Sequence, residues 1–336
     1  MVVFGAGASY DSFGALTPPN PKQYRMPLAN ELFDLRFGDD YRLFPQCHPV
    51  IPLLQRSGVN VESVLEGLQQ DAKQYSPGLV QLAAIRYYLG YMLSRCQETW
   101  TDTVTKGVTN YKTLLDQIAR RAIGKEKVCL VTFNYDTLLD EALTSRGVKL
   151  QSMLDYIRSD FYLIKLHGSV NWAHEVRNYP IKNGDLSVLI PEIIDNAPNL
   201  DVNSDSFELA NANPFNRPFG KPLFPALAIP VENKPGYECP QDHQKVLKEF
   251  FPQITKVLLI GWRANENRFL NDLATNMSKR VSVMVVSRDQ TSASQTLTRI
   301  SPVMGKNGVI MNNFFAAKTS FSGFVFSSEL TEFLQN

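Results

Sequence analysis

The sequence has little net charge, few cysteines and no long apolar run. Its 34 Lys and Arg residues balance 33 Asp and Glu residues, and the formal charge of +1 gives no general attraction to nucleic acid or to an anionic membrane. No apolar run approaches the roughly 20 residues that a membrane-spanning helix needs, and no charged segment followed by an apolar one marks a signal peptide. We therefore expect a cytoplasmic protein that binds neither nucleic acid nor a membrane directly.

Cysteine is scarce and scattered. The four cysteines, Cys47, Cys96, Cys129 and Cys239, lie far apart and form no C-x-x-C pair. This spacing is typical of free, mostly buried thiols in a reducing compartment, and not of a disulfide framework or a zinc site.

Short apolar runs are the clearest structural signal. With 336 residues and 44% hydrophobic content, the chain can bury a substantial core. Continuous apolar runs favour strands buried on both faces of a parallel sheet, and helical patterns follow several of them. Together they predict an α/β fold, a doubly wound, mostly parallel Rossmann-like sheet. The expected strands are 2–4, 128–133, 162–166, 257–260 and 281–286, and the expected helices between or after them are 137–146, 266–279 and 290–300.

Residues 15–126 read as a helical module inserted into this fold. Pro27 is expected to open one helix and Asn60 to cap another. A long amphipathic run at 79–98 and a helical pattern at 110–123, which ends at a glycine, follow them.

The remainder, residues 127–336, is expected to complete the Rossmann-like core of a single domain, 1–336. Residues 174–240 are rich in proline, asparagine and aspartate, and predict a loop-rich excursion of the kind that covers a site or a partner. The expected first strand is short for a central position, which is consistent with residues preceding Met1 in the natural protein.

The segment Gly5-Ala6-Gly7-Ala8-Ser9 directly follows the first apolar run, where an α/β fold places a phosphate-binding loop. Glycines in such a loop let backbone N–H groups approach a pyrophosphate. The dehydrogenase fingerprint G-x-G-x-x-G is incomplete because Tyr10 occupies the third glycine position, and the G-K-[ST] of a P-loop is absent. The motif predicts either a nucleotide loop or a tight turn beside the sheet.

Three later strand ends also carry polar residues or glycine. Asn134 and Asp136 follow the second apolar run, while His167 follows the third. Gly261 follows the fourth. Taken singly, Asp136 is explained as a helix cap, Asn134 as a turn residue and His167 as a structural histidine. Because carboxyl ends of parallel strands share one edge, together they favour a nucleotide site, with His167 a candidate for proton transfer.

The order of the motifs GAGAS, TFNYD, KLHGSVNW and LLIGW resembles the sirtuin superfamily. Within it, the sequence is similar to the bacterial sirtuin-like NAD-hydrolase domains of antiphage defence systems. The matching motifs are spread over residues 1–290. Deacylating sirtuins carry two C-x-x-C pairs that hold a structural zinc, and this sequence has none. The resemblance therefore implies NAD as substrate, no bound zinc, and no acyl-lysine peptide groove of the deacylase kind.

The resemblance also implies a role for each matching residue. Asn134 would orient the ribose hydroxyl or the attacking water, and His167 would accept a proton. Where many relatives have Ser after the late glycine, this sequence has Trp262. The residues implied to bind NAD are Gly5, Ala6, Gly7, Ser9, Asp136, Gly261 and Ser287.

Cleavage of the nicotinamide–ribose bond passes through an oxocarbenium-like centre, so the site must hold the ribose and place a nucleophile at C1′. With no acyl-lysine to compete, water is the expected acceptor, and the expected products are nicotinamide and ADP-ribose. The sequence leaves linear and cyclic ADP-ribose as open alternatives.

An unrestrained NAD hydrolase would deplete its own cell. We therefore expect activity to be switched by assembly, either into a homo-oligomer or with a partner protein that senses infection, in an abortive-infection defence system. An NAD-dependent deacylase, an ADP-ribosyltransferase and a non-catalytic NAD- or ADP-ribose-binding module remain open. A nuclease is disfavoured, because the sequence has no paired carboxylates at metal-ligand spacing and no basic face.

Overall fold

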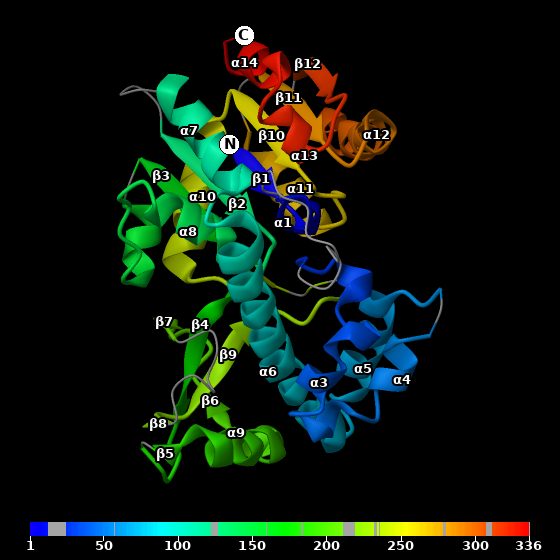
Figure 1. Ribbon diagram of the computed structural model, residues 1–336, viewed down its shortest axis with the longest axis vertical. Helices are drawn as coiled ribbons and strands as arrows, with labels where there is room; N and C mark the ends of the chain where they lie inside the picture. The colour runs from blue at the N-terminus through cyan, green and yellow to red at the C-terminus, as the bar shows by residue number, and fades with distance from the viewer. Residues whose placement is uncertain are drawn as a thin grey trace.

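A six-stranded sheet forms the upper half of the molecule as drawn in Figure 1, with helices packed around it. The computed structural model describes residues 1–12, 25–56, 58–121, 127–158, 160–182, 184–210, 219–231, 234, 236–277, 280–306 and 311–335. All neighbouring strands of this sheet pair in parallel, in the order β12-β11-β10-β1-β2-β3. The strands are β1 (Val2–Phe4), β2 (Val128–Thr132), β3 (Phe161–Lys165), β10 (Lys256–Ile260), β11 (Val281–Val286) and β12 (Met311–Ala316).

Counted by position along the chain, these six strands have the spatial order 3-2-1-4-5-6 of a doubly wound nucleotide-binding sheet. The sequence-based prediction of a mostly parallel, Rossmann-like α/β fold is thus confirmed. The last strand, β12, was not among the predicted ones, since its MNNFFA sequence lacks a continuous apolar run.

Helices cover both faces of the sheet. Within β1, Val2 and Phe4 contribute to one hydrophobic core and Val3 to the other, as the alternation of side chains along a strand requires. The first core includes side chains of α7 (Asn110–Arg121), α8 (Leu138–Thr144), α13 (Phe321–Phe324) and α14 (Ser328–Gln335). The second includes α10 (Gln241–Phe250), α11 (Asn267–Asn276) and α12 (Gln290–Lys306).

The regular elements that the structure describes between β1 and β2 are all helical. Asn60 caps α5 as expected, because its Oδ1 accepts from the N–H groups of Glu62 and Ser63. Pro27 opens no helix, and the first turn after it is the short 3₁₀ segment η1. The glycine expected to end the 110–123 helix, Gly124, lies outside the described residues. The elements are α1 (Ala6–Tyr10), η1 (Ala29–Glu31), η2 (Leu35–Phe37), α3 (Gly38–Tyr41), η3 (Pro45–Cys47), α4 (Ile51–Leu54), α5 (Val61–Asp71), α6 (Ser76–Thr99) with a π-helical extension η4 (Trp100–Thr105), and α7.

The two longest of these helices, α6 and α7, pack against different parts of the molecule. The 24-residue α6 packs against β4, β9, α5 and α9, and it is buried on most of its sides. The sequence analysis grouped helix α7 with the helical module, but α7 packs on the sheet. The ring centroids of its Tyr111 and of Phe4 in β1 lie 5.1 Å apart. The helical segments between α1 and α7 lie beside the sheet and not on it (Figure 1).

The segment expected to be a loop-rich excursion contains a small antiparallel sheet. Its long strand β4 pairs with β6, β7 and β9, while β5 pairs with β8. Four of these strands are two residues long, too short to show any periodicity in the sequence. The elements are β4 (Gly168–Arg177), β5 (Gly184–Asp185), α9 (Leu186–Asp195), η6 (Ala197–Asn199), β6 (Asp201–Val202), β7 (Glu208–Leu209), β8 (Phe219–Gly220) and β9 (Leu223–Leu227), with η5 (Met153–Ile157) before them and η8 (Phe251–Gln253) after.

Within the described ranges, the search for a helix long and apolar enough to cross a bilayer found none.

Candidate functional site

The strand order reverses between β1 and β10, and open α/β sheets usually bind ligands outside the carboxyl ends of the strands at such a point. The Gly7 N–H donates to the Gly261 carbonyl over 3.0 Å there. Gly261 has a φ of +61°, and a Cβ added to it would lie 2.1 Å from the Ala8 nitrogen. A Cβ on Gly5 would lie 2.7 Å from the Gly261 oxygen. The close approach of two strand ends therefore requires these glycines, with or without a ligand.

The backbone amides of the glycine loop are largely committed to the protein. Those of Gly5, Gly7 and Ala8 donate to the carbonyls of Ile260, Gly261 and Gly5. The interpretation in which these glycines free their amides for a pyrophosphate is therefore not supported. Ala6 is the exposed residue of the motif.

Asn134, just past the end of β2, is the centre of a buried polar cluster. Its Nδ2 donates to the Gly5 carbonyl at 3.0 Å, to Ser9 Oγ at 2.9 Å and to the Tyr111 hydroxyl at 3.1 Å. Ser9 Oγ in turn donates to Asp136 Oδ2 at 2.6 Å and lies 2.8 Å from the Tyr111 oxygen. Side chains from the glycine loop, from α7 and from the β2–α8 turn thus form one cluster.

The other end of the Asn134 side chain has no partner. Its Oδ1 is buried and makes no hydrogen bond within the described structure. The Gly5 carbonyl is only an acceptor, so it fixes the amide orientation and keeps the NH₂ group on the cluster side. Since buried acceptors are almost always paired, Oδ1 is positioned to accept from a hydroxyl or N–H group of a ligand or water.

Asp136 joins this cluster to a buried ion pair. Its Oδ1 accepts from the Leu138 N–H at 3.1 Å, and its backbone carbonyl accepts from Lys165 Nζ at 2.7 Å. Lys165 is fully buried and also donates to Asp140 Oδ2 at 2.8 Å. Burial raises the pKa of Asp136, while the Ser9 hydrogen bond and the Lys165 charge oppose that shift. The ammonium group of Lys165 therefore holds the turn that carries Asn134.

His167 lies two residues beyond the end of β3 and contacts the residues on both sides of Asn134. Its ring centroid is 4.9 Å from that of Phe133 and 6.2 Å from that of Tyr135. The side chain is buried, and burial together with the nearby Lys234 charge holds the pKa of His167 well below its ordinary value of 6.5. The imidazole is therefore neutral at physiological pH and available as a proton acceptor.

Lys234, whose charge acts on His167, lies near carboxylates from two other segments. Burial lowers the pKa of Lys234, against the opposing effect of Glu266 and Glu62. Burial likewise raises the pKa of Glu266, against the effects of Lys234 and of the Trp262 indole N–H, which donates to Glu266 Oε2. The helical module, through Glu62 in α5, therefore faces the same edge of the sheet as His167.

Trp262, which directly follows Gly261, is a packing residue. It is buried and stacks on Phe133 with ring centroids 5.2 Å apart and an interplanar angle of 14°. It also meets Phe269 of α11 edge-on at 5.6 Å. The aromatic stack fixes the chain after β10 against the turn after β2.

The structure thus brings Gly5, Gly7, Ser9, Asn134, Asp136 and Gly261 together, with His167 beside them. Ser287 directly follows β11 at the same sheet edge, and no hydrogen bond from it to the cluster occurs among the described contacts. Sequence reasoning missed Tyr111, whose helical pattern indicates only a core aromatic, and Lys165. A lysine inside an otherwise apolar strand was the available signal for Lys165.

No group of three or more potential metal-ligating side chains occurs in the part of the chain that the structure describes. The four cysteines are all buried and free. Burial raises the pKa of the Cys47, Cys96 and Cys129 thiols to about 12, so these side chains are protonated.

Strand order and site geometry define a Rossmann-like α/β protein with a polar cluster at the switch point of its sheet. No protein-family model and no curated protein matches the chain. Among solved structures, it is similar to Sir2 in complex with the inhibitor EX-527, 2′-O-acetyl-ADP-ribose and a deacetylated p53 peptide, at 14% identity and a TM-score of 0.36, over 98% of this chain and 92% of that one. It is similar to Sir2 with a p53 peptide and NAD⁺ at 12% identity and a TM-score of 0.36, over the same shares. Similarity at this level does not establish membership of the family.

Proposed function

We propose that this protein is an NAD⁺ hydrolase that cleaves NAD⁺ into nicotinamide and ADP-ribose. The observation that carries the proposal is the buried, unpartnered Asn134 Oδ1 at the switch point, with a neutral imidazole beside the same turn. A ribose bears hydroxyl donors of the kind that Oδ1 lacks, and the ordered sirtuin-like motifs end at this edge of the sheet.

Asn134 is suited to orient the reacting ribose. The two hydrogens of its NH₂ group are shared among three acceptors, which restricts rotation of the side chain and leaves Oδ1 as an oriented acceptor. A rigid acceptor for a ribose hydroxyl or for the attacking water lowers the entropic cost of reaching the transition state. The Lys165 contact with the Asp136 carbonyl adds to this rigidity.

His167 is suited to accept the proton that is released. The proton comes from the attacking water, directly or through a ribose hydroxyl, as the C1′–nitrogen bond to nicotinamide breaks and the water oxygen bonds to C1′. A base must be unprotonated when substrate arrives, and the depressed pKa of His167 keeps it so throughout the neutral range.

Water is the proposed acceptor because the sequence has none of the cysteine pairs that support the deacylase zinc ribbon. Short strands and α9 occupy the segment after His167 instead. We further propose that the activity serves antiphage defence and is switched by assembly into a homo-oligomer or with a partner that senses infection. The support for this role is the motif resemblance, together with the cost of unregulated NAD⁺ loss.

Incubation with NAD⁺ followed by product analysis tests the reaction. The wild type is tested alone, together with the proteins encoded beside it, and in cells challenged with phage. It is expected to release nicotinamide and ADP-ribose. Asn134→Ala and His167→Ala are expected to lose activity by a factor on the order of 10² or more. The surface variants Asn199→Ala and His48→Ala serve as matched controls with unchanged rates. A wild type that releases no nicotinamide under any of these conditions contradicts the proposal, and labelled protein bands in cell extract would indicate an ADP-ribosyltransferase.

A further inference from the structure

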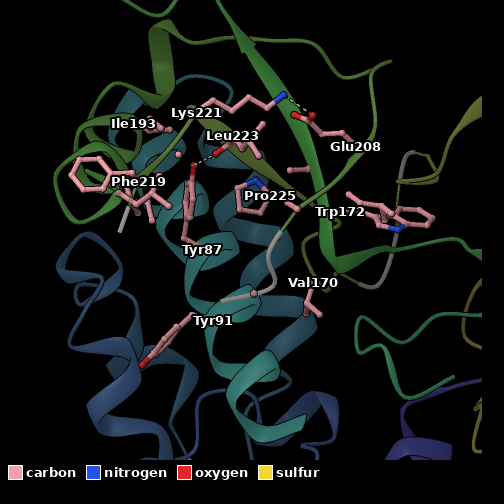
Figure 2. A pocket seen from close by; sticks show the side chains of 17 residues that line it. Tyr87, Tyr91, Val170, Trp172, Ile193, Glu208, Phe219, Lys221, Leu223 and Pro225 are labelled. Carbon is pink, nitrogen blue, oxygen red and sulfur yellow. Dashed lines mark hydrogen bonds and ion pairs between the residues drawn. The ribbon is translucent and has the colours of Figure 1, made fainter. Parts of the chain in front are cut away.

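A half-open cavity lies between α6, β4, β9 and α9, and none of its lining residues belongs to the site described above (Figure 2). Its volume is about 630 Å³, within the range of roughly 300 to 1,000 Å³ typical of small-molecule sites. The walls are mainly aromatic and aliphatic and include Tyr87 of α6, Ile190 of α9 and Phe219 of β8. Such walls favour a planar apolar ligand.

Two polar groups of this cavity have unused acceptor capacity. Lys221 Nζ donates to Glu208 Oε2 at 2.6 Å, and Figure 2 shows this ion pair at one end of the cavity. Glu208 Oε1 is buried without a hydrogen-bond partner in the described structure. The Tyr87 hydroxyl already donates to the Leu223 carbonyl, so its oxygen has only acceptor capacity left for a ligand. A ligand that satisfies these two acceptors therefore carries an N–H or ammonium donor.

Strand β4, which forms one wall of the cavity, is hydrogen-bonded to the turn of the candidate active site. Val170 of β4 lines the cavity, and its N–H donates to the Tyr135 carbonyl at 2.9 Å, next to Asn134 in the chain. The Trp172 ring lies on the side of β4 away from Tyr87 (Figure 2).

On that side, β4 connects to the buried ion pair. The Trp172 indole N–H donates to the Tyr156 hydroxyl at 3.3 Å. The Tyr156 hydroxyl donates to Asp140, which pairs with Lys165. Strand β4 also begins at Gly168, directly after His167. A displacement of β4 would therefore shift the backbone next to both Asn134 and His167.

We propose that this cavity binds a small aromatic amine, with its donor group at Glu208, and that occupancy regulates the candidate active site through β4. The binding part stands on the cavity alone, whereas the regulatory part rests on the proposed NAD⁺ cleavage.

Calorimetry on the intact chain with tryptamine tests the ligand class. We expect saturable 1:1 binding with a Kd on the order of 1 mM or below, as a ligand of this size allows. 3-Ethylindole, which lacks the amine, is expected to bind about tenfold more weakly, and Glu208→Gln to weaken tryptamine by a similar factor. Glu249→Gln, exposed on α10, is the matched control with unchanged affinity.

A cavity-filling variant tests the place of binding. Gly90 lines the cavity, and a Cβ added to it meets only a Leu227 side-chain carbon at 3.5 Å. Gly90→Leu is therefore expected to abolish tryptamine binding with the Tm retained, while Gly67→Leu on α5, where a Cβ meets nothing within 4 Å, leaves binding unchanged. If Gly90→Leu fails to fold, Glu208→Gln still decides the question.

Three results would overturn the binding site. They are no tryptamine binding up to about 5 mM, binding that neither Glu208→Gln nor a folded Gly90→Leu weakens, and tighter binding of indole-3-propionate, which would make Lys221 the recognising group.

The regulatory part has its own readouts. Saturating tryptamine is expected to change hydrogen exchange of the Val170 amide and to change the NAD⁺ cleavage rate about fivefold or more. Equal cleavage rates with and without bound tryptamine contradict the regulatory role. A chain that binds tryptamine but never cleaves NAD⁺ contradicts the proposed function and leaves the binding site standing.

Discussion

The side-chain amide of Asn134 donates a 3.0 Å hydrogen bond to the carbonyl of Gly5, which ties the end of β2 to the end of β1. This single contact decides which end of the amide stays unpaired, because a carbonyl accepts and never donates. The candidate site is therefore oriented by the sheet itself, before any ligand arrives.

Removal of hydroxyls from the Asn134 cluster should cost stability. Ser9→Ala deprives both Asp136 Oδ2 and Asn134 Nδ2 of a partner, and we expect a loss of about 1 to 3 kcal/mol in the free energy of unfolding. Tyr111→Phe keeps the ring packing and should cost about 1 kcal/mol. Urea titration of both single variants and of the double variant measures their coupling, expected to be at least about 0.5 kcal/mol. Tyr75→Phe, at an exposed tyrosine, is the control.

Gly261→Ala should destabilise the protein more than the same substitution at another glycine with a positive φ. Gly147 has a φ of +86° and open space around its Cβ position, so Gly147→Ala measures backbone strain alone, about 1 kcal/mol. Gly261→Ala adds the clash with Ala8 and should cost at least about 2 kcal/mol more. Comparable thermal midpoints for the two variants would show that the strand ends separate easily.

Lys165→Met leaves the Asp140 carboxylate buried without its cation. We expect a loss of about 3 to 5 kcal/mol in unfolding free energy. Lys165→Met combined with Asp140→Asn removes both charges and should recover part of the loss, whereas Lys248→Met on α10, where the lysine is exposed, should change little. Equal losses in the single and double variants, measured in guanidinium, would argue against a stabilising ion pair.

His167 should make the protein less stable in mild acid. Its pKa is depressed in the folded state and near 6.5 in the unfolded state, so below pH 6.5 the unfolded state binds the extra proton. Unfolding free energy should fall with acidification from about pH 7, by up to about 1.4 kcal/mol per pH unit. His243, with its pKa also lowered by burial, adds to the slope, and Asp136, with its pKa raised, opposes it at lower pH. His167→Gln should reduce the dependence of unfolding free energy on pH, measured by urea titration at several pH values. An unchanged dependence would mean that a group other than His167 takes up the proton on unfolding.

Much of the sheet and of the site was predictable from the sequence. Buried parallel strands carry continuous apolar runs, and their carboxyl ends share an edge, so Asn134, His167 and Gly261 were expected to lie together. Tyr111 and Lys165 contribute through contacts between distant segments, for which a single sequence holds no signal beyond an aromatic on a helix and a charge in a strand. The two-residue strands near β4 form because β4 offers them a partner, and such pairing leaves no pattern of its own.

The central position of β1 has a consequence for synthesis. Val2 pairs with Leu130 on one side and with Leu258 on the other, so the innermost strand acquires its second neighbour only after most of the chain has left the ribosome. The Gly7 contact with Gly261 therefore cannot form until β10 has been made, whereas every residue of the polar cluster around Asn134 is made before β10.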